Sequence, residues 1–158
     1  MSPWSVILIA ILALAADRAT RSAALAPMTE GASIPVFCGF NLTLGFNEGA
    51  SFGILSGVMA GKPLAMAALT AAITMALAMM ALRPRNPWEA AGFALAVGGS
   101  LGNILDRLRQ GAVTDFLDVY WQEWHWPTLN VADVAITIGA GLMLIPALPA
   151  LRKKDEYA

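Results

Sequence analysis

The sequence contains few of the residues that build disulfides and metal sites. Its 158 residues include one cysteine and one histidine, Cys38 and His125. A single cysteine excludes an intramolecular disulfide, and no spacing of Cys and His is of the zinc type. We therefore expect no metal and no other cofactor. We interpret Cys38 as a small buried hydrophobic residue.

Charge of either sign is also scarce. Ten Lys and Arg oppose eleven Asp and Glu, for a net charge of −1, which argues against a nucleic-acid partner. Hydrophobic residues make up 58% of the chain, and the mean hydropathy is +0.63. This composition predicts an integral membrane protein in contact with membrane lipids, with residues 1–158 forming a single domain.

Long apolar runs divide the chain into four predicted membrane spans, each close to the roughly 20 residues that a helix needs to cross a bilayer. The spans cover about 4–26, 63–82, 88–106 and 131–151. The first run also resembles a signal peptide, but the preceding segment MSPW has no Lys or Arg, so we favour a span. The predicted fold class is an all-α membrane protein with four transmembrane helices.

The glycine-rich segment between the first two spans does not fit a span. Leu42, Leu44 and Phe46 alternate with smaller residues, a pattern that predicts a short half-exposed strand. We therefore expect a small β-sheet over about 30–57, lying at the membrane surface outside the cytoplasm.

Basic residues favour one orientation of these spans. Arg83 and Arg85 lie between the second and third spans, and three more basic residues follow the fourth. Four spans place both groups on one side, which is cytoplasmic by the positive-inside rule. Both termini would then be cytoplasmic. The aromatic segment 109–126 would form an interfacial loop on the other side, with a short extended stretch over 112–116.

Acidic residues gather in the stretch 98–133, although acids are costly in so apolar a protein and there indicate a function. Four of them are aspartates, namely Asp106, Asp115, Asp118 and Asp133. At the start of this stretch, Gly98 and Gly102 form a small-residue face that would let another helix approach closely.

Two predicted helices carry polar residues on one face. Asp17 and Arg21 are four residues apart, so they either pair locally at a helix end or face the protein interior. Asn103, Asp106 and Arg107 share a face of the third span. There Asp106 and Arg107 would neutralise each other, or Asp106 would bind the backbone.

Asp115 and Asp133 are candidates for a catalytic pair. Two close carboxylates do not both ionise cheaply, so one holds a proton while the other acts as a base. Such a pair could activate water against a peptide carbonyl without a metal. Alternatively, Asp133 only belongs to a helix start, since Asn130 precedes it as a potential N-cap. A protease and a proton-coupled transporter both remain open at this point.

The order of the motifs resembles that of the lipoprotein signal peptidase (signal peptidase II) family. The series runs GGxxGNxxDR from Gly98, GxVxDFxD from Gly111 and NxAD from Asn130. Asp17 with a basic residue at position 21 matches an earlier motif of that family, as does the Asn47-x-Gly49 segment. The resemblance covers nearly the whole chain.

This resemblance implies an aspartic endopeptidase of the bacterial inner membrane with its active site near the periplasmic face. Its substrates would be prolipoproteins with a diacylglyceryl-modified cysteine, cut just before that cysteine. By position, Asp115 and Asp133 would be catalytic, and the N-terminus of the last helix would leave the shared proton on Asp115. Supporting or substrate-binding positions would be Asp17, Asn47, Gly49, Asn103, Arg107 and Asn130. We expect a monomer.

The chain departs from the family pattern at four positions, namely Arg21, Glu48, Ser51 and Leu129. The family usually has Lys at position 21, and Arg keeps that charge but not its shape. We expect the departures to affect substrate or lipid preference more than activity. They also motivate an alternative, a relative that binds lipidated chains without cutting them.

Overall fold

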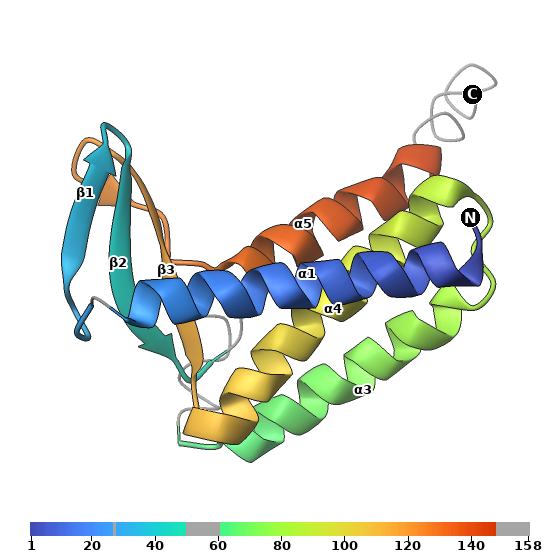
Figure 1. The fold of residues 1–158 in the computed structure, drawn as a ribbon, viewed down its shortest axis with the longest axis horizontal. Helices are drawn as coiled ribbons and strands as arrows, with labels where there is room; N and C mark the ends of the chain where they lie inside the picture. The colour runs from blue at the N-terminus through green and yellow to red at the C-terminus, as the bar shows by residue number, and fades with distance from the viewer. Residues whose placement is uncertain (27, 50–60, 148–158) are drawn as a thin grey trace, which may run out of the picture.

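The computed structural model describes residues 1–26, 28–49 and 61–147. Within these residues the helices are α1 (Pro3–Leu25), α3 (Pro63–Ala81), α4 (Pro87–Gln110) and α5 (Val131–Leu144), with a 3₁₀ turn at Ile145–Ala147. The strands are β1 (Ser33–Phe37), β2 (Phe40–Asn47), β3 (Val113–Trp121) and β4 (Trp124–His125). The helices form an elongated bundle, and the sheet stands at one end of it (Figure 1).

The helices begin and end at residues that suit helix ends. The Ser2 side chain accepts from the Ser5 amide at 3.2 Å, and the Asn86 side chain accepts from the Glu89 amide at 2.9 Å. A proline follows each of these caps, in the first turn where its missing N–H costs nothing. Helix α4 ends at Gly111, whose φ of 83° is a left-handed conformation that favours glycine.

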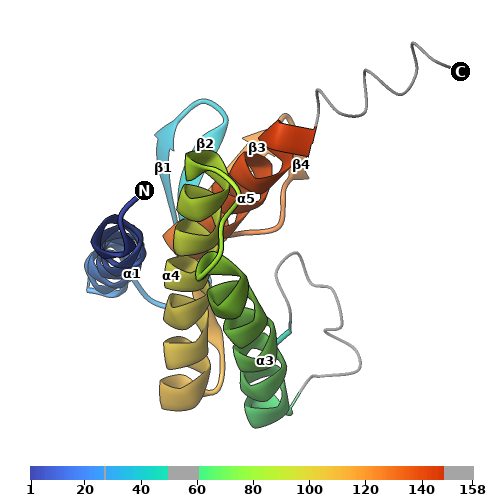
Figure 2. The same cartoon turned by 90° about the vertical axis from the view of Figure 1, so that its right-hand side faces the viewer.

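Helix α4 lies at the centre of the bundle and packs against α1, α3 and α5, with α1 and α3 on opposite sides of it (Figure 2). Gly98 and Gly102 make the contact with α1 possible. A Cβ atom at Gly98 would overlap the carbonyl of Ala10, and one at Gly102 would overlap the carboxylate of Asp17. The prediction that these glycines admit a neighbouring helix is confirmed.

Helix α5 contains two glycines that differ only in what surrounds them. A Cβ at Gly139 would lie 2.6 Å from the carbonyl oxygen of Gly92, whereas a Cβ at Gly141 would meet nothing within 4 Å. We expect Gly139→Ala to destabilise the protein by about 1–3 kcal/mol, because α4 and α5 must separate. Gly141→Ala is the matched control, and we expect it to be neutral or to stabilise by up to about 1 kcal/mol. Thermal unfolding of both variants in detergent checks this, and equal midpoints would contradict it.

Two of the described helices are long and apolar enough to cross a membrane, at Pro3–Ala24 and Pro63–Ala81. Helix α4 extends beyond the predicted span on both sides. Helix α5 has 14 residues and is shorter than the predicted span 131–151, whose last four residues lie outside the described part. That α4 and α5 also cross the membrane stays a prediction.

The sheet is antiparallel, with strand order β1-β2-β3-β4. The register pairs Gly45 with Asp115 and Asn47 with Val113, which brings the end of β2 to the start of β3. The predicted extended stretch over 112–116 is confirmed for 113–116. The prediction of an interfacial loop is wrong for 117–121, where β3 continues as a strand. Residues 50–57 of the predicted β-region lie outside the described residues.

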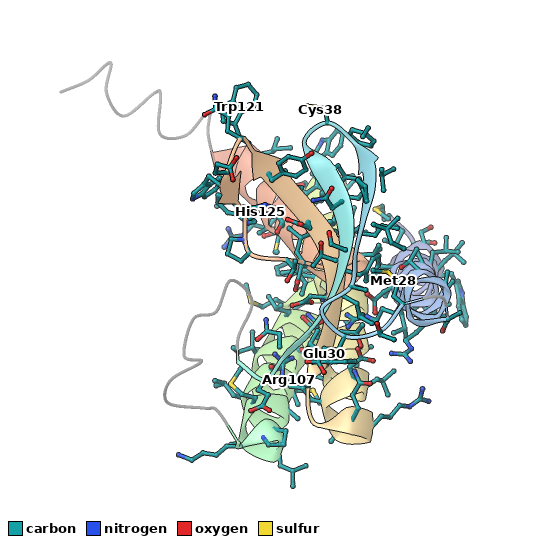
Figure 3. All side chains as sticks on the ribbon, turned by 90° about the vertical axis from the view of Figure 1, so that its left-hand side faces the viewer. Met28, Glu30, Cys38, Arg107, Trp121 and His125 are labelled. Atoms are coloured by element: carbon teal, nitrogen blue, oxygen red, sulfur yellow. The ribbon has the colours of Figure 1, made fainter. Side chains whose placement is uncertain are left out.

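Cys38 lies in the turn between β1 and β2 and is exposed (Figure 3). The prediction of a buried cysteine is wrong, because the β1–β2 hairpin projects from the bundle and nothing covers its tip among the described residues. The sheet stands at one end of the bundle. The N-terminus and the α3–α4 connection lie together at the other end (Figure 1).

Candidate active site

Asp115 and Asp133 come from different elements and are both buried beside α4. Asp115 lies in β3 and is 3% exposed, and Asp133 lies in the first turn of α5 and is 6% exposed. The main-chain N–H of Asp133 donates to Oδ1 of Asn130 at 2.9 Å, so the predicted N-cap is present. That cap uses the backbone of Asp133 and leaves its carboxylate to a different contact.

Two asparagine amides connect the carboxylates. Nδ2 of Asn130 donates to Oδ1 of Asp115 at 2.6 Å, and Nδ2 of Asn103 donates to Oδ1 of Asp133 at 3.0 Å. The same Nδ2 of Asn130 lies 3.4 Å from Oδ1 of Asn103. Both asparagines are buried. The structure thus brings together the two predicted catalytic residues and two of the predicted supporting residues.

The end of β2 supplies a second support for Asp115. Nδ2 of Asn47 donates to Oδ2 of Asp115 at 3.2 Å, and Oδ1 of Asn47 accepts from the Gly49 amide at 2.9 Å. Arg107 of α4 donates from Nη2 to the Gly49 carbonyl at 2.5 Å (Figure 3). Asn47, Gly49 and Arg107 therefore form one connection from α4 to Asp115.

The surroundings of Asp115 change its ionisation. Burial raises the pKa of its carboxyl group, and the nearby charge of Asp133 raises it further, to about 7. Hydrogen bonds from Asn130 and Asn47 to the ionised form oppose this shift without cancelling it. A pKa raised this far lets Asp115 exchange a proton near neutral pH.

The polar pair of α1 faces the interior, as one of the two interpretations predicted. Asp17 is 0% exposed and Arg21 is 1% exposed, and Nε of Arg21 donates to Oδ2 of Asp17 at 2.8 Å. Oδ1 of Asp17 also accepts from the Ala132 amide at 3.0 Å, in the first turn of α5. Asp17 thus binds the backbone of the residue before Asp133.

Two partners were predicted for Asp106, the Arg107 side chain or the backbone. The first is wrong and the second is confirmed, since the Thr114 amide donates to Oδ2 of Asp106 at 3.0 Å. Asp106 forms ion pairs with Arg18 and with Arg21, both from α1. Arg107 turns toward Gly49 instead. Consecutive helical residues point in directions about 100° apart, so Asp106 faces α1 while Arg107 faces the end of β2.

A second carboxylate of β3 belongs to a separate cluster that sequence reasoning missed. Asp118 accepts from Nδ1 of His125 at 2.8 Å and from the side chains of Thr43 and Asn41. Burial raises the pKa of Asp118, but these hydrogen bonds outweigh it and hold the pKa below its usual value. A sequence-based prediction of the register between β2 and β3 could have found this cluster, because that register pairs Asn41 with Asp118.

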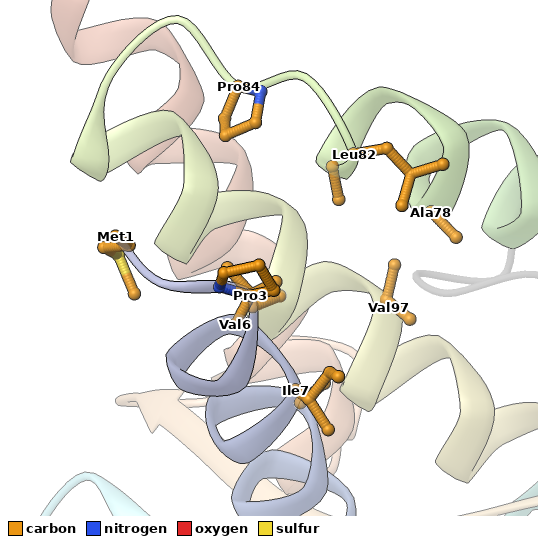
Figure 4. A pocket seen from close by; sticks show the side chains of 11 residues that line it. Met1, Pro3, Val6, Ile7, Ala78, Leu82, Pro84 and Val97 are labelled. Carbon is orange, nitrogen blue, oxygen red and sulfur yellow. The ribbon is translucent and has the colours of Figure 1, made fainter.

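Two cavities differ in what they could hold. One of about 260 Å³ opens beside Asp133 and is otherwise lined by aromatic, aliphatic and threonine side chains, namely Trp126, Leu129, Val134, Thr137 and Ile138. Another of about 340 Å³ lies between α1, α3 and α4 at the end of the bundle away from the sheet (Figure 4). That cavity has no acidic side chain in its lining, so the cavity beside Asp133 is the one that concerns the candidate site. In the described ranges, no three His, Cys, Asp or Glu side chains lie close enough to hold a metal ion.

Comparisons with known proteins identify the family of this chain. The family model described as "Signal peptidase (SPase) II" matches residues 9–148. The chain is 40% identical to a lipoprotein signal peptidase of Azoarcus sp. (strain BH72), over 99% of this chain and 88% of that relative. It is 37% identical to one of Burkholderia mallei (strain SAVP1), over 96% of this chain and 91% of the relative.

Solved structures give the same result. A bacterial membrane enzyme determined by the in meso method at 2.3 Å resolution matches with a TM-score of 0.84 and 31% identity, over 96% of this chain and 92% of that chain. A second such structure, at 1.9 Å resolution, matches with a TM-score of 0.80 and 32% identity, over 92% of this chain and 94% of that chain. With both its sequence and its fold matched over nearly their whole length, the chain belongs to the signal peptidase II family of membrane proteases that process lipoproteins.

Proposed function

We propose that this protein is an aspartic endopeptidase that removes the signal peptide from diacylglyceryl-modified prolipoproteins, cutting just before the lipidated cysteine. The observation that carries the proposal is the pair of buried amides, Asn103 and Asn130, that connects the carboxylates of Asp115 and Asp133. Such a connection holds two acids together in a site that supplies few other reactive groups.

The reaction follows from one protonated and one ionised carboxyl group. Asp133 removes a proton from a water molecule as the water oxygen attacks the scissile carbonyl carbon, while Asp115 gives its proton to the carbonyl oxygen. When the tetrahedral intermediate collapses, the C–N bond breaks and the leaving amine takes the proton from Asp133. Asp115 takes back the proton from the former carbonyl oxygen, which restores both carboxyl groups to their starting states. The raised pKa of Asp115 supports its role as the group that starts with the proton.

The surroundings of Asp133 support a lipidated substrate. The apolar cavity that opens beside it suits hydrocarbon better than a polar peptide. A lipid-modified cysteine stays in the bilayer, so its scissile bond would reach the enzyme at the membrane surface. The lipid and the carboxylate pair would then act on neighbouring parts of one substrate.

The topology that fits this function has α1, α3, α4 and α5 crossing the bacterial inner membrane in a monomer. Both termini would be cytoplasmic, and the sheet would form a cradle on the periplasmic face. Three observations support this arrangement: the N-terminus and the α3–α4 connection share one end of the bundle, Arg83 and Arg85 lie in that connection, and the candidate pair lies at the sheet end.

A cleavage assay with the purified enzyme tests the proposal. A prolipoprotein carrying diacylglyceryl on its cysteine is compared with the same precursor lacking the lipid, and the product is identified by mass spectrometry. We expect cleavage of the lipidated precursor alone, immediately before the modified cysteine. If several lipidated precursors are not cleaved, the protein is better described as a relative that binds without cutting. Equal cleavage of the lipidated and unlipidated forms would overturn the proposed specificity.

The pH dependence of the reaction follows from the ionisation of Asp115. In the free enzyme its pKa is about 7, and the active form carries a proton on this group. Raising the pH through 7 removes that proton, so we expect kcat/KM to fall about tenfold per pH unit well above this value. Initial rates over a pH series check the prediction, with protein stability measured at each pH as the control. A rate that keeps rising above pH 8 would contradict it.

A further inference from the structure

Arg21 of α1 is a buried cation whose contacts extend toward both aspartates. Arg21, Asp17 and Asp106 form one buried cluster. In it, Nε of Arg21 donates to Asp17 at 2.8 Å and Nη1 donates to Asp106 at 2.5 Å. Two further bonds leave this cluster. Nη1 donates to the Thr114 carbonyl at 2.9 Å, and Nη2 donates to Oδ1 of Asn103 at 2.6 Å.

The bond to Asn103 determines which end of this amide faces Asp133. A side-chain amide presents an acceptor oxygen on one side and a donor NH₂ group on the other. With its oxygen held by Arg21, Asn103 directs Nδ2 to Asp133, to which it donates at 3.0 Å. A flipped amide would place its oxygen against the carboxylate. Arg21 therefore selects the orientation in which Asn103 stabilises ionised Asp133.

The bond to Thr114 acts on the other aspartate. Thr114 directly precedes Asp115, and its carbonyl accepts from Arg21. Its main-chain N–H donates to Oδ2 of Asp106 at 3.0 Å, and Asp106 is itself paired with Arg21. Both main-chain polar groups of Thr114 are thus bound to one cluster, which fixes the position of β3 next to Asp115.

We propose that Arg21 is a positioning residue that aligns both aspartates, Asp133 through the Asn103 amide and Asp115 through the Thr114 carbonyl. The inference rests on the proposed function, because it takes these aspartates to be the reacting groups. A guanidinium group suits the task, since its planar fork reaches acceptors in several directions at once. A lysine at this position would retain the charge but offer a single nitrogen.

The test compares kinetics of Arg21→Met and Arg21→Lys. For Arg21→Met we expect kcat to fall about 10²-fold from misplacement of the aspartates, with little change in KM because the residue is buried. The cation lowers the pKa of Asp115, so its loss should also move the alkaline limb of kcat/KM to higher pH. Arg21→Lys keeps the charge and should return this limb toward the wild-type position, with an intermediate kcat. Other charged groups around Arg21 and Asp115 stay constant, namely Asp17, Arg18, Asp106, Arg107 and Asp133.

Arg18→Met is the matched control. Arg18 comes from the same helix and also pairs with Asp106, but it does not bond to Asn103 or Thr114. We expect it to keep the wild-type kcat and pH profile. If Arg21→Met does not fold, the double variant Asp17→Asn/Arg21→Met removes one charge of each sign and takes its place, with the same expected loss.

The outcomes separate this inference from the proposed function. If the wild-type enzyme cuts and Asp115→Asn does not, the proposed function stands. The positioning role is then overturned if folded Arg21→Met, or the double variant, keeps the wild-type kcat and pH profile. It is also overturned if Arg18→Met loses as much activity and shifts the profile equally. If the wild-type enzyme does not cut, the proposed function itself fails.

Discussion

Replacing Asp115 or Asp133 with asparagine is expected to reduce kcat by about 10³-fold, close to 4 kcal/mol of transition-state stabilisation. Asparagine keeps the shape of the side chain but neither holds nor accepts the transferred proton. At position 115 the amide oxygen would retain one of the two hydrogen bonds from Asn47 and Asn130. The loss would therefore be chemical, and the fold would remain. Single-turnover cleavage of a diacylglyceryl precursor measures it.

Asp118→Asn is the matched control for Asp115→Asn. Asp118 lies in the same strand and is also buried, but its carboxylate binds the side chains of His125, Thr43 and Asn41. We expect a lower melting temperature and a kcat within about threefold of wild type, since none of these groups bonds to the candidate pair. A loss of kcat equal to that of Asp115→Asn would show that any buried acid of this strand is essential. The assignment of the catalytic pair would then fail.

Asp106→Ala should cause the largest loss of stability, about 3 kcal/mol or more, because it breaks a buried ion pair and leaves one partner behind. Asp106 binds Arg21, which is 1% exposed, as well as Arg18 and the Thr114 amide. After the substitution, Asp17 alone would balance the Arg21 charge. Unfolding by a denaturing detergent in mixed micelles measures the change in free energy.

Arg18→Met provides the comparison for this loss. It removes one ion pair of Asp106, but the Arg18 side chain is 29% exposed and Asp106 keeps its bond to Arg21. A pair so open to its surroundings contributes up to about 1 kcal/mol. If the two substitutions lowered the free energy of unfolding by the same amount, the buried cluster would not be what connects α1 to α4.

The sequence was most informative where residues are spaced along one helix. The four-residue interval of Asp17 and Arg21 and the interval of Gly98 and Gly102 follow helical geometry, so their shared faces could be predicted without a fold. The motif order likewise supplied the family and the order of the site residues. The two intervals depend on local helical geometry, which the sequence encodes directly, whereas the motif order is informative through its resemblance to a known family.

Contacts between elements could not be predicted in this way. Asp106 and Arg107 lie at the same end of one helix but contact different elements. Asp106 pairs with Arg21 of α1, and Arg107 donates to Gly49 after β2. The predicted extended stretch stops at residue 116, whereas β3 continues to Trp121, because Asp118 interrupts the apolar pattern. Asp115 and Asp118 are both buried in the structure, where hydrogen bonds from other elements compensate for their polarity.

The bond between Asp17 and the Ala132 amide also has a consequence for biogenesis. Its partners are 115 positions apart, so the site is incomplete until α5 has left the ribosome. Translation at about 5–20 residues per second leaves the first helix without this partner for on the order of ten seconds. During that interval Asp17 and Arg21, one helical turn apart, can neutralise each other. The pairing of opposite charges within α1 thus lets a helix with buried ionic groups enter the membrane before the rest of the enzyme exists.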